Sequence, residues 1–338
     1  MTLKWSILDQ SPIVEGETGA DAFRHTVELA QLADKLGYNR FWVSEHHDGP
    51  LAGSSPEVLI AYLIDKTERI RLGSGGVMLQ HYSPYKVAEN FNVLATLAPG
   101  RIDLGVGRAP GGLPRSTQAL QRGVTEPQSL AEKLDELAHH VNRTLPDDHA
   151  LAGIQASPPA AQPADIYLLG TTVGSSELAA DQGVNYVFAE FINGDPAAVK
   201  EALALYRERF KPRTAGARPQ PIVAISVVVA DTDEEAERLA IDIKNIRVTL
   251  ADGRTLNLST IAQAEEFGKQ SGQAYTITER TPEIIKGSKE TVRAQLLKKQ
   301  QEYGVDEFIV VTLLKRFEQR LHSYELLHEA FAEVSRQT

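Results

Sequence analysis

The segment 101–112, RIDLGVGRAPGG, combines a short strand with a glycine-rich loop that carries one arginine. Its glycines do not fit a dinucleotide-binding fingerprint, because the third comes one residue late and because Pro110 and Pro114 prevent a regular helix. What remains is a flexible loop that presents its backbone and the guanidinium of Arg108. An arginine can hold a phosphate through two hydrogen bonds, so the segment predicts a phosphate site. An ordinary turn with a surface arginine is the alternative.

A second loop with phosphate-binding chemistry is LGTTVGSSELAA, at 169–180. It opens a helix near Gly174 or Ser175, and the free amides and the dipole of a helix start attract an anion. Ordinary capping of that helix by Ser175 or Ser176 is the alternative, and capping is compatible with phosphate binding. The hydroxyl donors that the loop adds are Thr171, Thr172 and Ser175.

The segment SEHHDG places Glu45, His46 and His47 directly after a short apolar strand. The two histidines could suggest a metal, but neighbouring residues at a strand end point to opposite sides and no partner motif accompanies them. One histidine could instead be a hydrogen-bonded core residue. The third interpretation is an imidazole that handles protons, because the ordinary pKa of histidine lies near neutrality.

The segment GSGGVM, at 73–78, holds three glycines in four positions. A flat ligand could lie against such a backbone, because no Cβ atom intervenes. A strand bulge or a tight bend of a barrel is the alternative. Gly75 and Gly76 could also adopt an unusual peptide geometry.

Strand-like and helix-like segments alternate along the chain, which is typical of a parallel sheet. Eight such strands predict a closed (β/α)₈ TIM barrel, with an open doubly wound sheet as the alternative. In such a barrel the active site lies where the strands end, and all four segments described above follow strands. The expected strands are 4–8, 40–43, 70–74, 101–105, 166–170, 186–190, 222–230 and 307–312, and the expected helices are 20–37, 57–67, 85–97, 127–144, 175–183, 196–210 and 317–334.

Two segments interrupt this alternation, within what we expect to be a single domain over 1–338. Residues 145–163 are rich in proline and alanine and predict an excursion. Residues 243–288 show little apolar periodicity and predict a mobile insertion before the last strand. Long loops in compact domains are often lids or binding loops, so this insertion is a candidate lid.

The composition narrows the class of protein. The 338 residues include 35 basic and 45 acidic side chains, a formal charge of -10, which argues against a nucleic-acid or an anionic-membrane partner. The absence of cysteine excludes disulfides, thiolate metal sites and cysteine nucleophiles. No signal peptide and no bilayer-spanning apolar run is visible, so a cytoplasmic protein is expected.

Taken together, these motifs resemble the bacterial luciferase-like, flavin-dependent monooxygenases. The resemblance runs through SILDQSP, FWVSEHH, the block 70–112, YLLGTTVGSSELAADQGV, VVVADTDEEAERLA and YGVDEFIVV. It implies a (β/α)₈ barrel that binds FMN at the mouth formed by the ends of its strands. The insertion 243–288 matches the family poorly, so the substrate cannot be inferred from the sequence.

The resemblance also assigns roles to individual residues. His46 matches the family's active-site imidazole, and Arg108 matches the arginine that contacts the FMN phosphate. The loop after the fifth strand completes that phosphate site, although it lacks the tyrosine that many relatives carry there. The bond between Gly75 and Gly76 matches a cis peptide beneath the flavin ring. The implied phosphate donors in the loop are Thr171, Thr172, Gly174 and Ser175.

The implied activity is oxidation of a small organic substrate by reduced FMN and O₂. Because no dinucleotide fingerprint is present, a separate NAD(P)H-dependent flavin reductase would supply the reduced FMN. The resemblance further implies a homodimer. Two other functions remain open: a deazaflavin-dependent dehydrogenase or reductase on the same barrel, and a flavin-binding protein without catalytic activity.

Overall fold

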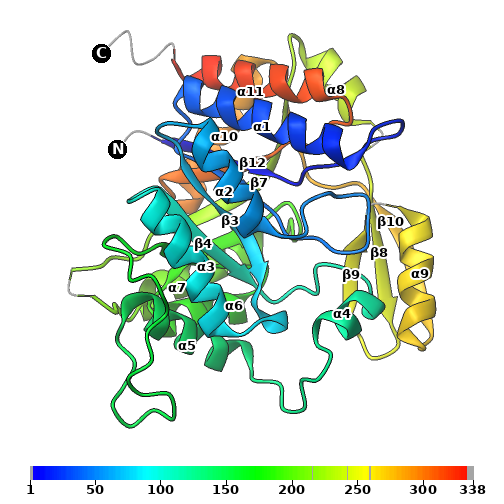
Figure 1. Ribbon diagram of the computed structural model, residues 1–338. Helices are drawn as coiled ribbons and strands as arrows, with labels where there is room; N and C mark the ends of the chain where they lie inside the picture. Colours follow the sequence, from blue (N-terminus) through cyan, green and yellow to red (C-terminus); the bar gives the residue numbers. More distant parts are fainter. Residues whose placement is uncertain (1–2, 215, 242, 259, 333–338) are drawn as a thin grey trace.

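A closed barrel of eight parallel strands forms the centre of the computed structural model (Figure 1), which confirms the predicted fold class. The structure describes residues 3–214, 216–241, 243–258 and 260–332. Each barrel strand pairs with the next along the chain, and the last strand closes the ring by pairing with both the seventh and the first. The barrel strands are β1 (Lys4–Asp9), β2 (Arg40–Val43), β3 (Arg71–Met78), β4 (Ile102–Gly107), β5 (Asp165–Gly170), β6 (Asn185–Ala189), β7 (Pro221–Val229) and β12 (Glu307–Val311).

Helices surround the barrel, and their ends carry local signals. The first helix begins at a capping box made by Thr18 and Asp21, and it ends at Gly37, whose φ of 81° suits glycine. The expected helix over 317–334 ends at 332, and its last two residues lie outside the described part of the chain. The helices are α1 (Gly19–Leu36), α2 (Pro56–Lys66), α3 (Pro84–Leu97), α4 (Pro114–Leu120), α5 (Leu130–Asn142), α6 (Val173–Asp181), α7 (Pro196–Arg209), α8 (Asp233–Ala240), α10 (Lys289–Tyr303) and α11 (Phe317–Ala332), with a short 3₁₀ helix η1 (Leu79–His81).

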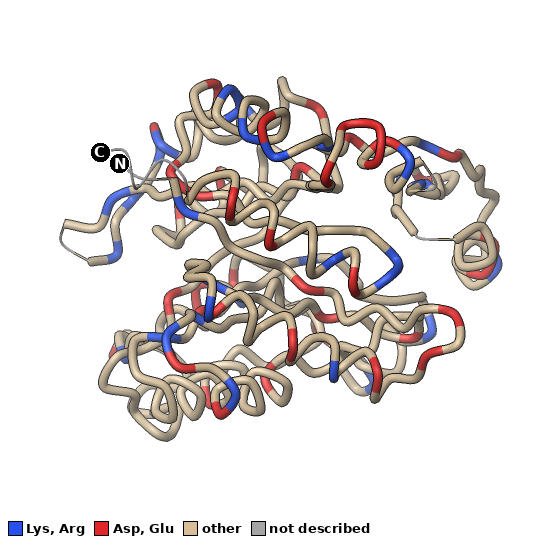
Figure 2. The backbone as a smooth tube through the Cα atoms, turned by 90° about the horizontal axis from the view of Figure 1, so that it is seen from above, with Lys and Arg blue, Asp and Glu red and all other residues tan. Residues whose placement is uncertain are grey.

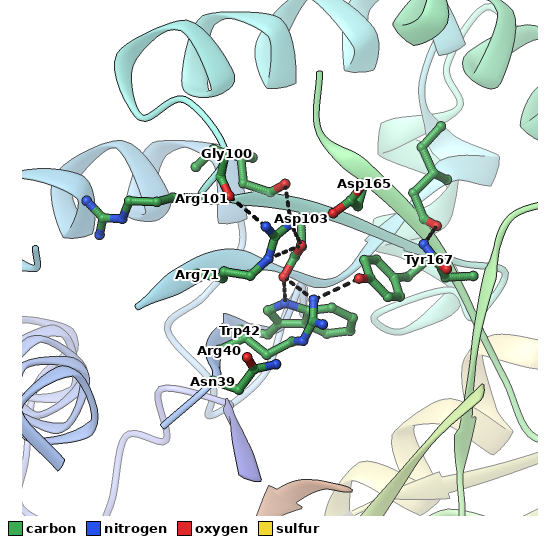
Figure 3. Close-up of polar contacts among 12 residues, drawn as sticks. Asn39, Arg40, Trp42, Arg71, Gly100, Arg101, Asp103, Asp165 and Tyr167 are labelled. Carbon is green, nitrogen blue, oxygen red and sulfur yellow. Dashed lines mark hydrogen bonds and ion pairs between the residues drawn. The ribbon is translucent and has the colours of Figure 1, made fainter. Parts of the chain in front are cut away.

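Ion pairs fill the end of the barrel at which the strands begin, here called the floor (Figure 3). Arg40 places its Nη1 2.8 Å from Asp103 Oδ2 and its Nε 2.7 Å from Glu307 Oε1. Trp42 Nε1 and Arg71 Nε also donate to the Asp103 carboxylate. Burial opposes the charge of Arg40, but the neighbouring Asp103, Tyr167 and Glu307 raise its pKa above the ordinary value. The floor is therefore a buried charge network that joins several strands.

An apolar layer inside the barrel is contributed by β1, β2, β5, β6, β7 and β12. The opposite faces of the strands pack on the helices in the main core. Along the described chain, Lys and Arg are interspersed with Asp and Glu, and no continuous basic stripe stands out (Figure 2). The buried members of the inner layer are Leu8, Trp42, Tyr167, Val187, Ile222, Ala224, Ile309 and Val311.

The insertion before the last barrel strand contains regular helices and strands, although its sequence shows little apolar periodicity. It contains β8 (Asn245–Leu250), β9 (Thr255–Leu258), α9 (Ile261–Ser271) and β10 (Tyr275–Arg280), followed by β11 (Ile285–Gly287), which pairs with β7. The antiparallel order is β10-β8-β9, and buried Ile246, Val248 and Leu250 pack with Ala264 of α9. This alternation has the period of a strand and spans only six residues of β8. The excursion 145–163 contains turns and irregular structure, as expected.

The floor generates a stability prediction. Asp103→Ala leaves Arg40 buried with one carboxylate fewer, so we expect the free energy of unfolding to fall by about 3–5 kcal/mol. Asp165→Ala is the matched control, because Asp165 also pairs with Arg71 but its side chain is 56% exposed. Asp165→Ala should lower the free energy of unfolding by less than about 1 kcal/mol. Urea unfolding measures both, and equal losses would contradict a dominant role for the buried pair.

Candidate active site

The four sequence segments singled out above meet at one end of the barrel, here called the rim. Strand register fixes this arrangement: Val43 lies opposite Ser74, Met78 opposite Gly107, and Val106 opposite Leu168. The loops after β2, β3, β4 and β5 therefore start at adjacent points of the rim. His46, Arg108, Thr171 and Thr172 lie in these loops, Gly75 and Gly76 lie within β3, and Gly174 and Ser175 lie in the first turn of α6.

His46 is held near the rim in a partly buried position. Its Nδ1 lies 2.9 Å from Ser44 Oγ, and its backbone N–H donates to Gly53 O at 2.7 Å. Burial, followed by the nearby His47, lowers the pKa of His46 to about 4. The imidazole is therefore neutral at neutral pH, whereas the ordinary pKa of histidine had suggested a group poised near neutrality.

His47 belongs to a different set of contacts, centred on the buried Glu45. His47 Nε2 lies 2.8 Å from Glu45 Oε1, and Tyr82 Oη donates to the same oxygen at 2.8 Å. Met78 N donates to Glu45 Oε2 at 3.0 Å, and His47 N donates to Gly111 O at 2.7 Å. One carboxylate thus joins the loops after β2 and β3, and His47 links them to the Arg108 loop. Sequence reasoning missed this role of Glu45, although the EHH triplet contained it.

The glycines of β3 are required by close packing. The peptide bond between Gly75 and Gly76 is cis, as the resemblance implied. A Cβ on Gly76 would lie 2.8 Å from the backbone of Gly105, and one on Gly75 would lie 2.7 Å from Leu8 Cδ1. The pairing of β3 with β4 also shifts register between Ser74 and Val77. The shifted register agrees with the strand bulge considered for GSGGVM, and the close approaches leave no room for a side chain at either glycine.

Arg108 is exposed at the rim and makes no hydrogen bond or ion pair with any residue the structure describes. It follows β4, and the neighbouring β5 leads to the start of α6. Thr172 caps that helix by accepting from Ser175 N at 3.3 Å. No atom lies within 4 Å of a Cβ built on Gly107 or Gly174, so the backbone has open space at both loops.

The hydroxyls after β5 differ in availability. Ser175 Oγ donates to Thr172 O at 2.6 Å and lies 2.9 Å from Tyr186 Oη, so this hydroxyl is occupied within the loop. Thr172 Oγ1 accepts from Ser175 N and keeps its proton for another partner. The amides of Val173 and Gly174, in the first helical turn, have no acceptor within the helix. With Arg108, these donors fit a phosphate group, and Ser175 mainly shapes the loop.

The insertion touches three parts of the rim. Asn257 Nδ2 of β9 donates to Ile192 O, after β6, at 3.2 Å. Arg115 N of α4 donates to Gln270 Oε1 of α9 at 3.0 Å. A Cβ on Gly49, after β2, would lie 3.4 Å from Gln263 Nε2 of α9. The insertion therefore reaches from the loop after β6 to the loops after β2 and β4.

The described residues contain neither a metal-binding cluster nor a membrane-spanning helix. No group of three or more His, Cys, Asp or Glu side chains is arranged to hold a metal ion. Within the same residues, every helix is too short or too polar to cross a membrane.

The closed barrel, with its polar and glycine-rich loops at the ends of the strands, has the architecture of TIM-barrel enzymes. Residues 1–307 match the family model of luciferase-like monooxygenases, and the chain belongs to this family. It is 44% identical to N-acetyl-S-alkylcysteine monooxygenase of Bacillus subtilis, over 99% of this chain and 100% of that protein. Among solved structures it resembles apo-MsnO8, with a TM-score of 0.76 and 36% sequence identity. The match covers 97% of this chain and 98% of that one.

More distant structures share the fold alone. One is the oxygenating constituent of 3,6-diketocamphane monooxygenase in complex with FMN, at 18% identity and a TM-score of 0.71 over 98% of each chain. Another is an F420-dependent secondary alcohol dehydrogenase, at 14% identity and a TM-score of 0.68 over 98% of this chain and 99% of that one. Membership of the family supports an oxidoreductase that uses a flavin or a deazaflavin.

The lowered pKa of His46 predicts a pH-dependent stability. In the unfolded chain His46 takes up a proton near its ordinary pKa of 6.5, whereas the folded protein keeps it neutral down to about pH 4. The stability present above pH 6.5 is therefore lost as the pH falls toward 4, by up to about 1.4 kcal/mol per pH unit. The His46→Asn variant should lose less stability than the wild type over this pH range, because it lacks the imidazole that takes up the proton. Urea unfolding at pH 7.5 and pH 5 compares them, and equal losses would contradict the assignment.

Proposed function

We propose that this protein is a monooxygenase that uses reduced FMN and O₂ to oxidise a small organic substrate. The observation that carries the proposal is Arg108, which is exposed and has no partner among the described residues. It directly follows β4, and the neighbouring β5 leads to the N-terminus of α6. FMN ends in a phosphate that this arrangement can hold. The similarity to a monooxygenase at 44% identity favours oxygenation over the deazaflavin-dependent alternative, whose example is 14% identical.

The proposed cofactor-binding residues form two groups, one for the phosphate of FMN and one for its ring system. Arg108, the hydroxyls of Thr171 and Thr172, and the amide of Gly174 would hold the phosphate, with Ser175 fixing the loop. Gly75 and Gly76 would lie beneath the ring system at the inner edge of the rim. Reduced FMN, when bound, supplies the electrons for reaction with O₂ and carries the oxygen to the substrate.

His46 is the proton-handling group in this proposal. Its Nδ1 is occupied by Ser44 Oγ at 2.9 Å, which fixes the ring and leaves Nε2 without a partner in the described structure. A neutral imidazole can accept a proton or donate a hydrogen bond at Nε2, and its low pKa makes it a weak base rather than a standing cation. The insertion, which touches three parts of the rim, is placed to act as the lid that excludes water.

The first substrates to test are thioethers of the N-acetyl-S-alkylcysteine class, because the relative at 44% identity acts on them. A separate NAD(P)H-dependent reductase would supply the reduced FMN in the cytoplasm. Mass spectrometry detects the added oxygen after incubation with reduced FMN and O₂. A flavin-binding protein without activity would consume reduced FMN at the same rate with and without every substrate.

The proposed homodimer has a candidate interface on α2 and α3. These helices are in contact, and Glu57 Oε1 accepts from Asn90 Nδ2 at 3.3 Å. Four large apolar side chains are exposed on them, and exposed apolar patches of this kind often mark interfaces. The solution mass tests the dimer. The exposed side chains are Val58, Tyr62, Val93 and Leu97.

Arg108→Ala should weaken FMN binding at least tenfold, because a hydrogen bond to a charged group contributes about 1.5–3 kcal/mol. Riboflavin, which lacks the phosphate, should bind the variant and the wild type equally. Arg24→Ala, on α1 and 64% exposed, is the control that should change neither ligand. Fluorescence titration gives the dissociation constants. An equal loss for FMN and riboflavin would place Arg108 against another part of the flavin.

His46→Ala should keep FMN bound and slow substrate oxidation by about 10²–10⁴-fold, the usual contribution of a proton-transfer group. His47→Ala is the matched control, because it removes the contact with buried Glu45. We expect that variant to lose stability more than turnover. Stopped-flow oxidation of reduced FMN with product analysis measures turnover, and thermal unfolding measures stability. If His47→Ala lost turnover and His46→Ala lost mainly stability, the proton-transfer role would belong to His47.

A further inference from the structure

The sheet of the insertion has two chemically different faces. Ile246, Val248 and Leu250 of β8 face α9, so the residues between them lie on the opposite face. The register places Asn257 of β9 and Thr278 of β10 directly beside Arg247. No acidic residue occupies this second face at the paired positions. It consists of Asn245, Arg247, Thr249, Thr255, Asn257, Thr276, Thr278 and Arg280.

Arg247 stands at the centre of this face, and no carboxylate of the described residues forms an ion pair with it. It is half-buried, and its one hydrogen bond among the described residues runs from Nε to Asn257 Oδ1 at 3.1 Å. Buried Arg40 and Arg320, by contrast, are each paired with a carboxylate. Burial and the nearby Arg280 both disfavour the charge of Arg247 and lower its pKa. A desolvated guanidinium of this kind gains most from an anion that comes from outside the chain.

The contacts of Asn257 turn this face toward the rim. Asn257 Nδ2 donates to Ile192 O at 3.2 Å, and the adjacent Asn193 Nδ2 donates to Thr171 O at 2.8 Å. Arg247 is thus two side chains away from the loop after β5. Helix α9 packs on the opposite, apolar face of the sheet and lies on its outer side (Figure 1). The polar face of the insertion therefore borders the space in front of the barrel mouth.

We infer that Arg247, fixed by Asn257, binds the anionic oxygens of a ligand at the mouth, and that this ligand is the carboxylate of the substrate. The inference rests on the proposed function, which brings a small molecule to the same rim. The phosphate of FMN offers the same chemistry. In the proposed function Arg108 and the start of α6, which follow β4 and β5, supply donors for that phosphate, which leaves Arg247 for a second anion. The substrate class is accordingly a small organic acid, whose polar end contacts the insertion.

The test compares an acid with its uncharged amide. Isothermal titration calorimetry measures the binding of N-acetyl-S-methylcysteine and of its primary amide to the full-length protein, with oxidised FMN present. We expect the wild type to prefer the acid, and Arg247→Gln to weaken acid binding about tenfold or more while leaving the amide within twofold. Arg254→Gln is the control, because Arg254 lies in the same insertion, pairs with Asp252 and is 68% exposed. It should change neither ligand.

Three outcomes would overturn the inference. The wild type binds acid and amide equally or binds neither; Arg247→Gln weakens both ligands by the same factor, which indicates a packing role; or it weakens FMN but not riboflavin, which assigns Arg247 to the cofactor phosphate. Failure of the proposed function is distinguishable. In that case the acid binds with the expected selectivity, but reduced FMN and O₂ leave it unchanged.

Discussion

The buried guanidinium of Arg40 is the constraint on which the barrel depends. A charge inside the barrel is tolerated only if carboxylates meet it in good geometry, and Asp103 and Glu307 come from β4 and β12, on either side of β2. Both contacts require the strand order β12-β1-β2-β3-β4, in which one strand separates β2 from each carboxylate-bearing strand. Satisfying Arg40 therefore fixes neighbours across half of the ring. Trp42 connects the floor to the apolar layer above it, because its indole N–H donates to Asp103 while its ring packs in that layer.

Glu45 organises the rim as Asp103 organises the floor. It is buried, and its oxygens accept from Met78 N and Tyr82 Oη and contact His47. The two histidines of the EHH triplet consequently differ in their surroundings. His47 holds loops together, whereas Nε2 of His46 has no partner among the residues that the structure describes. Arg108, which is exposed and has no partner in the described part of the chain, takes no part in these contacts.

The sequence predicted the barrel because strand-like and helix-like segments alternate along it, with helix ends marked by residues such as Gly37 after α1. It also predicted which loops share a rim, since parallel strands all end on one side. The sequence did not predict contacts between residues that lie far apart along the chain. The role of Glu45 depends on Met78 and Tyr82, the state of His46 depends on burial, and the engagement of Ser175 depends on Tyr186. The sheet of the insertion was missed because β8 alternates over only six residues.

The loop after β6 couples the parts of the site that the barrel and the insertion supply separately. Asn193 of this loop holds Thr171, and the neighbouring Ile192 accepts from Asn257, which in turn orients Arg247. The phosphate loop and the polar face of the insertion are thus positioned by consecutive residues of one connection. A shift of the insertion that broke the contact with Ile192 would move Arg247, while the capping contacts of Thr172 would keep the start of α6 in place. The proposed cofactor site and the proposed anion site thus rest on different elements, the first on barrel strands and the second on a sheet with its own small core.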